Sequence, residues 1–429
     1  MSEITTDSAG QKITNPLHIP VKSDENVVLS IADQAAWLLS ARPAFELQQA
    51  EQISFLAHLT QSPLTLNQHF NVLQLPAADL VHYAYSIFKH SGCLIVVPTV
   101  NLAQWYLYLT TIMHNHSPEN HYHNWYHAVH VLLNCYRYVY PLLSQLQPLD
   151  IFALLLAALN HDLDHCGISN TALINQVDPL AVKYHKVSPL EQHSIDRALE
   201  ILNDEAHGTA LLQAVIQPNN NGAPVTNNEH NAAKSRVIEI FRNSILATDI
   251  SRTVDHEAIL THYLTFHNHL DYTDSNQCLQ LLTIILLCGD IGCVCEPFYQ
   301  SMQWCGRLYE EMQCHRNSRQ SNDIAKVVFQ PQSSLENDQG LYYSLDNKLI
   351  LPPSGSLSEY YTNQLKFLEY YAIALYARVS EPPSCSLGHL SPYTTRLRQN
   401  LIQLAHSYFL YEPSLGVLVK TLTSFSSPS

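Results

Sequence analysis

The sequence predicts an all-α protein, built from many helices around a sizeable core. Apolar residues recur at three- and four-residue spacing through most of the chain, which is the period of an amphipathic helix. Hydrophobic residues make up 46% of the 429 residues, enough to fill a large core. Segments with the alternating pattern of a β-strand are few. These three observations favour a compact multi-helix domain.

The first half of the chain contains the clearest helical patterns. Residues 1–25 are polar, and we expect them to be a disordered lead-in. From about 27 to 113, prolines interrupt the helical pattern, which predicts several short helices. Two longer helices are predicted at 126–143 and 149–160, with a proline-containing turn between them.

Helical and loop patterns alternate in the second half. Pro189 precedes EQHSIDRALEIL and predicts a helix that begins near this proline. The composition of 218–228, rich in asparagine, predicts a loop. Helical spacing returns in three segments, 236–251, 277–292 and 358–379.

One stretch departs from the helical pattern. Over 313–358, polar pieces flank β-branched and aromatic residues, which predicts a loop with a small β-hairpin at about 325–352. We therefore expect a single helical domain over 26–410 and a C-terminal tail over 411–429.

The charge balance excludes some classes of partner. With 22 basic and 37 acidic residues the net charge is −15, which disfavours nucleic acids and anionic membranes. The apolar runs 151–159 and 279–288 are too short to span a bilayer, so no membrane insertion is expected. The 10 cysteines are scattered and no signal peptide is visible, so we expect a soluble cytoplasmic protein with reduced thiols. The oligomeric state stays open.

Histidine and aspartate side chains gather where predicted helices end. His161 and Asp162, in NHDLDHCGISN, directly follow an apolar run, and Asp290 follows the run LLTIILLCG. His123 and His127 are four residues apart and so share one face of a helix. Each place alone also fits an ordinary solvated helix end, or histidines satisfied by hydrogen bonds.

Together these residues form a set of metal ligands. Imidazole nitrogens and carboxylate oxygens suit zinc or a similar divalent ion, and one carboxylate can bridge two ions. Charged groups next to apolar helices are costly unless a cation compensates them. Two nitrogen and two oxygen ligands leave positions open for water, as in catalytic sites. The set consists of His127, His161, Asp162 and Asp290.

The order and spacing of these motifs resemble the catalytic domain of the class I cyclic-nucleotide phosphodiesterases, a branch of the HD-domain metal phosphohydrolases. The family signature HDxxHxxxxN is matched by His161, Asp162, His165 and Asn170. The segment 122–128 matches the YHNxxHA element that precedes it. Further matches, in family order, are LEQHS, ILATDIS, GDIG, QWCGRLYEEM and NQLKF. The similarity extends over about 70–380.

The resemblance implies a hydrolase that converts cyclic AMP, cyclic GMP or both to 5′-nucleoside monophosphates. It implies zinc at the four ligands, and magnesium or manganese at a second position bridged by Asp162. A hydroxide between the ions would attack phosphorus, and His123 would act as general acid. Waters at the metals would be oriented by His165, Glu191 and Thr248. The nucleotide would contact Tyr122, Leu308, Gln364 and Phe367.

The chain also departs from the family pattern. Ser194 stands where the family has a second histidine, and the residues after Asp290 match no known substrate preference. A carboxylate that orients His123 is not evident, although Glu381 and Glu412 are candidates.

Two other functions remain open. One is an HD-type phosphohydrolase that acts on another nucleotide, and the other is a non-catalytic nucleotide sensor or scaffold. A purine-shaped pocket at Gln364 and Phe367 would favour cyclic nucleotides over other nucleotides. The complete ligand set and His123 argue against a non-catalytic protein. Without the resemblance, an aromatic residue and a leucine at helical spacing are more often core than pocket.

Overall fold

The computed structural model confirms the all-α prediction. It describes residues 70–206, 208–217, 226–266, 270–320, 357–381 and 387–411, and every regular element in these ranges is a helix. The predicted lead-in, the hairpin at about 325–352 and the tail beyond 411 lie outside the described residues.

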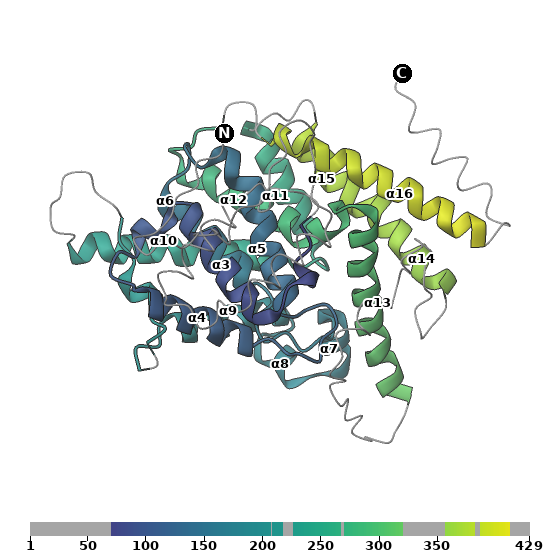
Figure 1. The fold of residues 1–429 in the computed structure, drawn as a ribbon, viewed down its shortest axis with the longest axis horizontal. Coiled ribbons are helices and arrows are strands. Elements are labelled where there is room, and N and C mark those ends of the chain that lie inside the picture. Colours follow the sequence, from purple (N-terminus) through teal and green to yellow (C-terminus); the bar gives the residue numbers. More distant parts are fainter. Residues whose placement is uncertain are drawn as a thin grey trace, which may run out of the picture. The chain divides into compact units, whose positions relative to one another are not determined.

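Figure 1 shows the arrangement of the helices in the described ranges. The α-helices are α3 (Ala77–His90), α4 (Leu102–His114), α5 (Trp125–Val139), α6 (Pro148–Asn160), α7 (Asn170–Gln176), α8 (Pro179–Lys183), α9 (Pro189–Leu202), α10 (Asn227–Leu246), α11 (Thr253–Phe266), α12 (Ser275–Asp290), α13 (Phe298–Gln320), α14 (Leu357–Phe367), α15 (Ile373–Ser380) and α16 (Ser391–Tyr411). The 3-10 turns are η2 (Val72–Gln74), η3 (Cys93–Val96), η4 (Tyr140–Leu142), η5 (Leu211–Ala214), η7 (Ile291–Cys295) and η9 (Gly388–Leu390). One π-helical turn, η8 (Leu368–Ala372), joins α14 to α15.

Helix α6 lies in the middle of the core and packs against α5, α10 and α12. Its residues from Leu149 to Asn160 are all buried. The helix is apolar on nearly every side, and such a helix is stable only when other elements surround it. Its one acidic residue, Asp150, accepts two hydrogen bonds from Arg236 of α10, at 3.0 and 3.1 Å.

Helix α12 and the turn η7 that follows it form a second core element. The stretch Ser275–Cys295 is long and apolar enough to cross a membrane by composition, but 83% of its most apolar window is buried inside the protein. It packs against α5, α6, α10 and α11. The apolar run visible in the sequence is shorter than this helix, and its burial identifies it as a core helix.

Two glycines let α12 and the turn η7 approach α5 closely. A Cβ atom on Gly289 would lie 2.6 Å from the Sγ of Cys135, and one on Gly292 would lie 2.5 Å from the Nδ2 of Asn134. Both distances are shorter than van der Waals contact, so a larger residue would push the helices apart. The close approach brings Asp290, between the glycines, against α5.

Most predicted helices are confirmed, with shifted ends. Helix α9 begins at Pro189 as expected. Helix α5 ends at Val139 and continues as a 3-10 turn, because Pro141 lacks an N–H group for the helix. The loop expected from residue 313 is wrong at its start, since α13 continues to Gln320. The polar residues there include glutamine and arginine, which are good helix formers.

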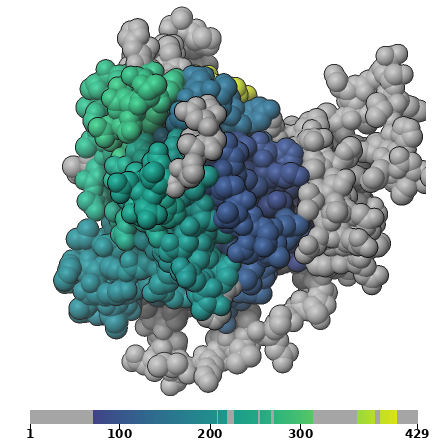
Figure 2. All heavy atoms as spheres, turned by 90° about the vertical axis from the view of Figure 1, so that its left-hand side faces the viewer, coloured from purple at the N-terminus to yellow at the C-terminus, as the bar shows by residue number. Residues whose placement is uncertain are grey.

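Segments far apart in the sequence share one face of the protein. In Figure 2 the purple-to-blue segment that carries α3 and α4 lies beside the teal segment that carries α9 and α10. Across this boundary, Arg197 of α9 donates a hydrogen bond of 3.0 Å to Asn115, which ends α4.

Candidate metal centre

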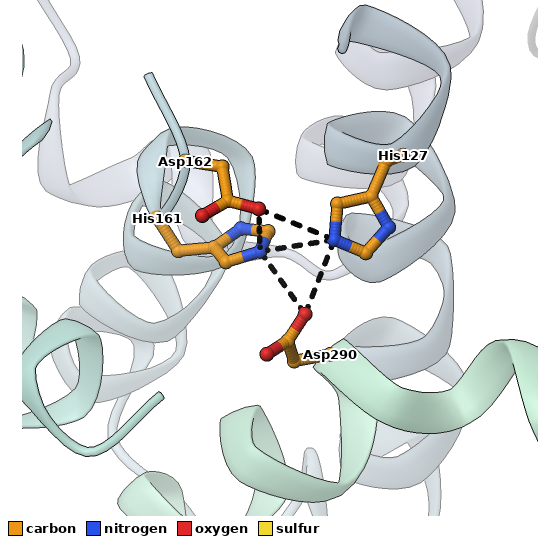
Figure 3. A group of neighbouring side chains, drawn as sticks. All are labelled: His127, His161, Asp162 and Asp290. Atoms are coloured by element: carbon orange, nitrogen blue, oxygen red, sulfur yellow. Dashed lines mark hydrogen bonds and ion pairs between the residues drawn. The ribbon is translucent and has the colours of Figure 1, made fainter. Parts of the chain in front are cut away.

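Three helix ends meet at the four expected ligands (Figure 3). His127 lies in the first turn of α5, which Asn124 caps. His161 and Asp162 directly follow α6, and Asp290 is the last residue of α12. The C-terminal ends of α6 and α12 expose backbone carbonyl groups with partial negative charge, which favours a cation.

The four side chains converge on one point. The Nε2 atom of His161 lies 3.3 Å from the Nε2 of His127 and 3.2 Å from the Oδ1 of Asp290. The Oδ2 of Asp162 lies 3.1 Å from the Nε2 of His161 and 3.4 Å from the Nε2 of His127. Four ligands about 2.0 Å from a tetrahedral zinc ion would be about 3.3 Å from one another. The observed separations therefore fit one ion with these ligands.

Burial makes this cluster depend on positive charge. The imidazoles of His127 and His161 are 0% and 1% exposed, and the carboxylates of Asp162 and Asp290 only 15% and 14%. Burial alone lowers the pKa of His161, but the two carboxylates raise it well above its ordinary value. Burial raises the pKa of Asp290, but His161 lowers it to about 2. A protonated His161 thus compensates the carboxylates, and a divalent ion can replace that proton.

The ring of His161 is oriented as a metal ligand requires. Its Nδ1 donates a hydrogen bond of 2.9 Å to the carbonyl oxygen of Ala158, so its Nε2 faces the cluster and offers a lone pair once an ion replaces its proton. The Nε2 of His127 also faces the cluster, 3.1 Å from the Oδ1 of Asp290. Its Nδ1 is buried without a hydrogen-bond partner among the described residues.

A second group, consisting of His123, His165 and Glu311, lies beside the cluster. The Nδ1 of His123 and the Oε1 of Glu311 form a short hydrogen bond. The Oε2 of Glu311 accepts hydrogen bonds from the backbone N–H groups of Tyr122 and His123, at 2.8 and 3.0 Å. Because both carboxylate oxygens are engaged, this group fits an oriented histidine better than a second metal site. The Nε2 of His123 remains available to a ligand.

The rings of His123 and His165 stack with their centroids 3.9 Å apart, yet they differ in charge. Burial lowers the pKa of His123, but the charges of Glu311 and Asp162 raise it to about 9. Burial lowers the pKa of His165 to about 3. The Nδ1 of His165 accepts a hydrogen bond of 2.9 Å from the N–H of Gly167, so its Nε2 carries the proton. At neutral pH, His123 is therefore the protonated ring and can act as an acid.

Glu311 is the carboxylate that orients His123, and sequence reasoning missed it. The candidate Glu381 is wrong, because it forms an ion pair with Arg398. The other candidate, Glu412, lies outside the described residues. Glu311 follows the buried Trp304 by seven residues on α13, so both lie on one face of the helix. A carboxylate at such a buried helix position was the available signal.

Glu191 and Thr248 lie at two other helix ends. The Oε2 of Glu191 accepts a hydrogen bond of 2.8 Å from the Nδ2 of Asn170. Burial, and then the charge of Asp249, raises the pKa of Glu191 to about 8. The hydroxyl of Thr248 donates a hydrogen bond of 2.8 Å to the carbonyl of Ile245 at the end of α10. The orientation of waters by these two side chains stays a prediction.

Helix α9 holds the loop that carries Asp162 at two more points. The hydroxyl of Ser194 donates a hydrogen bond of 2.9 Å to the carbonyl of Leu163. The Nε2 of His193 lies 2.9 Å from the Oδ2 of Asp164, a residue with a left-handed backbone at φ 61°. The departure from the family pattern at Ser194 thus has a structural use, because the hydroxyl fixes the loop.

Tyr122, expected to bind the nucleotide, packs behind a metal ligand. Its ring centroid lies 4.4 Å from that of His127, and its hydroxyl lies 3.5 Å from the Sγ of Cys293. The side chain is buried. This geometry supports the position of His127, while a contact with the nucleotide stays a prediction.

The remaining nucleotide residues lie on α13 and α14. Gln364 is buried, whereas Leu308 and Phe367 are partly exposed. The ring of Phe367 stacks with that of Tyr371, with centroids 5.5 Å apart. Burial, and then the charge of Asp290, raises the pKa of Tyr371. Phe367 therefore contacts a side chain that lies within electrostatic reach of the metal cluster. Sequence reasoning did not single out Tyr371.

Comparison with known families supports the resemblance. A family model described as 3′5′-cyclic nucleotide phosphodiesterase matches residues 122–383. This range includes every residue expected at the metal cluster and in the nucleotide pocket.

Curated relatives are similar over part of their length. The chain is 26% identical over 249 residues to the 3′,5′-cyclic-nucleotide phosphodiesterase regA of Dictyostelium discoideum, which covers 56% of this chain and 28% of that protein. It is 26% identical over 351 residues to the high affinity cGMP-specific 3′,5′-cyclic phosphodiesterase 9A of Drosophila melanogaster, which covers 79% of this chain and 19% of that protein. The chain thus spans less than a third of the length of either relative.

Solved structures share the fold. The crystal structure of the phosphodiesterase domain of the RhoPDE fusion protein from the choanoflagellate Salpingoeca rosetta aligns with a TM-score of 0.63 at 20% identity. The alignment covers 83% of this chain and 99% of that domain. The structure of LmjPDEB1 in complex with IBMX aligns with a TM-score of 0.61 at 17% identity, over 80% of this chain and 92% of that one.

Proposed function

Because the chain belongs to the 3′5′-cyclic nucleotide phosphodiesterase family, we propose that it hydrolyses cyclic 3′,5′-nucleotides to 5′-nucleoside monophosphates. The observation that carries the proposal is the convergence of two histidine nitrogens and two carboxylate oxygens beside a protonated, carboxylate-bound histidine. Such a site brings together what phosphodiester hydrolysis needs, which is a cation site and an acid for the leaving group.

We assign zinc to His127, His161, Asp162 and Asp290, and magnesium or manganese to a second position next to Asp162. Mixed nitrogen and oxygen ligands suit zinc, whereas the smaller hard ions prefer oxygen and water. Figure 3 supports a bridging carboxylate, because the second oxygen of Asp162 points away from the cluster. When bound, the two ions would neutralise charge on the phosphate and lower the pKa of a water.

The side chains of this protein would do the rest. His123 would donate its Nε2 proton to the 3′ oxygen of the ribose as the bond from that oxygen to phosphorus breaks. Glu311 would hold the ring and stabilise its charge. The Nε2–H of His165 would donate a hydrogen bond to a water, and Glu191 would accept one. These groups lie around the cluster within contact or electrostatic reach.

Nucleotide binding would fall to the residues of α13 and α14. The amide of Gln364 can donate and accept hydrogen bonds, as the edge of a purine requires. Phe367 and Leu308 would contact the two faces of the base, because flat rings bury large apolar areas against such side chains.

We place this activity in a reducing compartment, in keeping with the cytoplasm. The described cysteines are all free thiols, and all but Cys166 are buried. Buried unpaired thiols are typical of proteins from reducing compartments.

The test is hydrolysis of cyclic AMP and cyclic GMP, each alone, by purified protein with added magnesium. Asp290→Ala serves as the inactive variant, and Asp274→Ala as its matched control, since Asp274 only caps the other end of α12. We expect turnover of at least one nucleotide, retained in Asp274→Ala and lost with zinc in Asp290→Ala. No turnover by protein that holds one zinc per chain would point to another phosphoester. If the purified protein shows no turnover and contains no zinc, the proposal that it is an enzyme is refuted.

A further inference from the structure

We propose that Tyr371, anchored by a hydrogen bond to His256, is the positioning residue that fixes the ring of Phe367 in the nucleotide pocket. The inference rests on the proposed function, because it takes Phe367 as a residue that contacts the base. It extends that function by adding two residues that no family motif in the sequence contains.

The contact between the two rings is direct. The rings of Tyr371 and Phe367 stack, with centroids 5.5 Å apart and an angle of 27° between their planes. Tyr371 lies in the π-helical turn η8, which directly follows Phe367. Such a turn widens the helix locally and changes the direction of its side chains, and it is frequent at functional sites.

The hydroxyl of Tyr371 is held by a buried histidine. It lies 3.0 Å from the Nδ1 of His256, whose Nε2 lies 2.8 Å from the carbonyl oxygen of Ala247. Because a carbonyl only accepts, the Nε2 of His256 carries the proton and its Nδ1 has a lone pair. The hydroxyl of Tyr371 is therefore the donor. His256 is 4% exposed, and burial lowers its pKa, which keeps the ring neutral.

This chain of contacts joins the nucleotide end of the site to the metal end. Ala247 directly precedes Thr248, at the end of α10. Tyr371 itself lies within electrostatic reach of Asp290. Three helical elements, η8, α11 and the end of α10, are thus linked by the hydrogen bonds of His256 to Tyr371 and Ala247.

The anchor matters because Phe367 has no polar group of its own. Its side chain is partly exposed, so the surrounding core does not fix it fully. The stacked ring of Tyr371 is the contact that limits its motion. The hydrogen bond to His256 holds Tyr371 in one rotamer, and the stacked Tyr371 ring in turn holds the ring of Phe367. A ring already ordered before the nucleotide arrives loses less conformational entropy on binding, which increases affinity. The reacting atoms are not involved, so the expected effect is on KM and not on kcat.

The first variant is Tyr371→Phe, which keeps the stacked ring and removes only the hydroxyl. Tyr370→Phe is the matched control, because the adjacent Tyr370 is 71% exposed. The loss of one neutral hydrogen bond should raise KM by about threefold to tenfold. We expect kcat and the zinc content of Tyr371→Phe to stay at wild-type values, and Tyr370→Phe to match the wild type throughout.

The partner is tested with two substitutions of His256. His256→Gln retains an acceptor for Tyr371 and a donor for Ala247, so KM should remain near the wild-type value. His256→Leu removes both and should raise KM as Tyr371→Phe does. The double variant Tyr371→Phe/His256→Leu should show no further increase, because both changes break the same bond.

An unchanged KM in Tyr371→Phe, or KM increases that multiply in the double variant, would overturn the inference. So would a parallel loss of kcat and zinc, which would place Tyr371 with the metal ligands. If Tyr371→Phe does not fold, as judged by thermal melting, the comparison of His256→Gln with His256→Leu decides, since equal KM values would overturn it. Wild-type turnover in the same assay separates this failure from that of the proposed function.

Discussion

Replacing Glu311 by glutamine should shift the pH dependence of the proposed hydrolysis. The change removes the charge that faces the Nδ1 of His123 while keeping the size of the side chain. It also places an amide NH2 where the carboxylate now accepts hydrogen bonds from the backbone N–H groups of Tyr122 and His123. Folding stability should therefore fall as well, and the informative quantity is the shape of the pH profile rather than the absolute rate.

The size of the shift follows from the contact. A hydrogen bond to a charged group contributes about 1.5–3 kcal/mol, and one pKa unit corresponds to about 1.4 kcal/mol. In the wild type, burial lowers the pKa of His123 but Glu311 and Asp162 raise it to about 9. We expect the variant to have a pKa lower by about one to two units. A general acid works only when protonated, so activity is full below this pKa and is lost as pH rises through it. Bound cations would lower both values, and the difference between the proteins is the quantity to measure.

The assay is kcat as a function of pH, from about pH 6 to 10, for the wild type and Glu311→Gln. Glu310→Gln is the matched control, because Glu310 faces His121, 3.5 Å away, and not His123. We expect the alkaline decline to move to lower pH in Glu311→Gln alone, with zinc content unchanged. Profiles that differ only by a constant factor would refute the assignment of Glu311 as the group that sets the pKa of His123.

Three further outcomes are expected. Gly292→Ala should lower the free energy of unfolding by about 1–3 kcal/mol, because its Cβ would lie 2.5 Å from the Nδ2 of Asn134. In the control Gly388→Ala the new Cβ meets open space, so the free energy of unfolding should change by less than about 0.5 kcal/mol. Equal urea midpoints for the two variants would contradict this expectation. Zinc binding to metal-free protein near neutral pH should release the proton that the carboxylates hold on His161, so zinc affinity should rise with pH, and calorimetry in two buffers of different ionisation enthalpy should detect the proton. Gln364→Ala should raise KM by about tenfold with little change in kcat, and a loss confined to kcat would count against its placement at the base.

The cluster of the four expected ligands could be predicted from the sequence because local patterns mark its members. Asp162 follows a helix that is apolar on nearly all sides, and Asp290 ends a helix whose C-terminal half is apolar. The C-terminal turns of both helices are buried, so a carboxylate at their ends lies near the core and needs a counter-charge. The existence of these helices and the grouping of the four side chains therefore follow from composition and periodicity, with the family resemblance adding the expected roles.

The contacts that orient the acid and the aromatic ring could not be predicted in this way. His123 and Glu311 are 188 positions apart, and His256 and Tyr371 are 115 apart. Which distant side chain reaches a given histidine depends on how α13 and η8 pack, and no local pattern encodes that packing. Glu381 was an equally plausible choice by residue type, yet its helix places it against Arg398.

The convergence of helix ends has a thermodynamic consequence for the whole chain. His127 and Asp290 are separated by 163 positions, so an ion held by both would act as a reversible cross-link that closes a long loop. Closing such a loop removes entropy from the unfolded chain, as a disulfide does. The ion would therefore stabilise the packing of α5, α6 and α12 against one another even without substrate. Chelation should lower the melting temperature as well as the activity, which makes the supply of metal a determinant of how long the folded protein lasts.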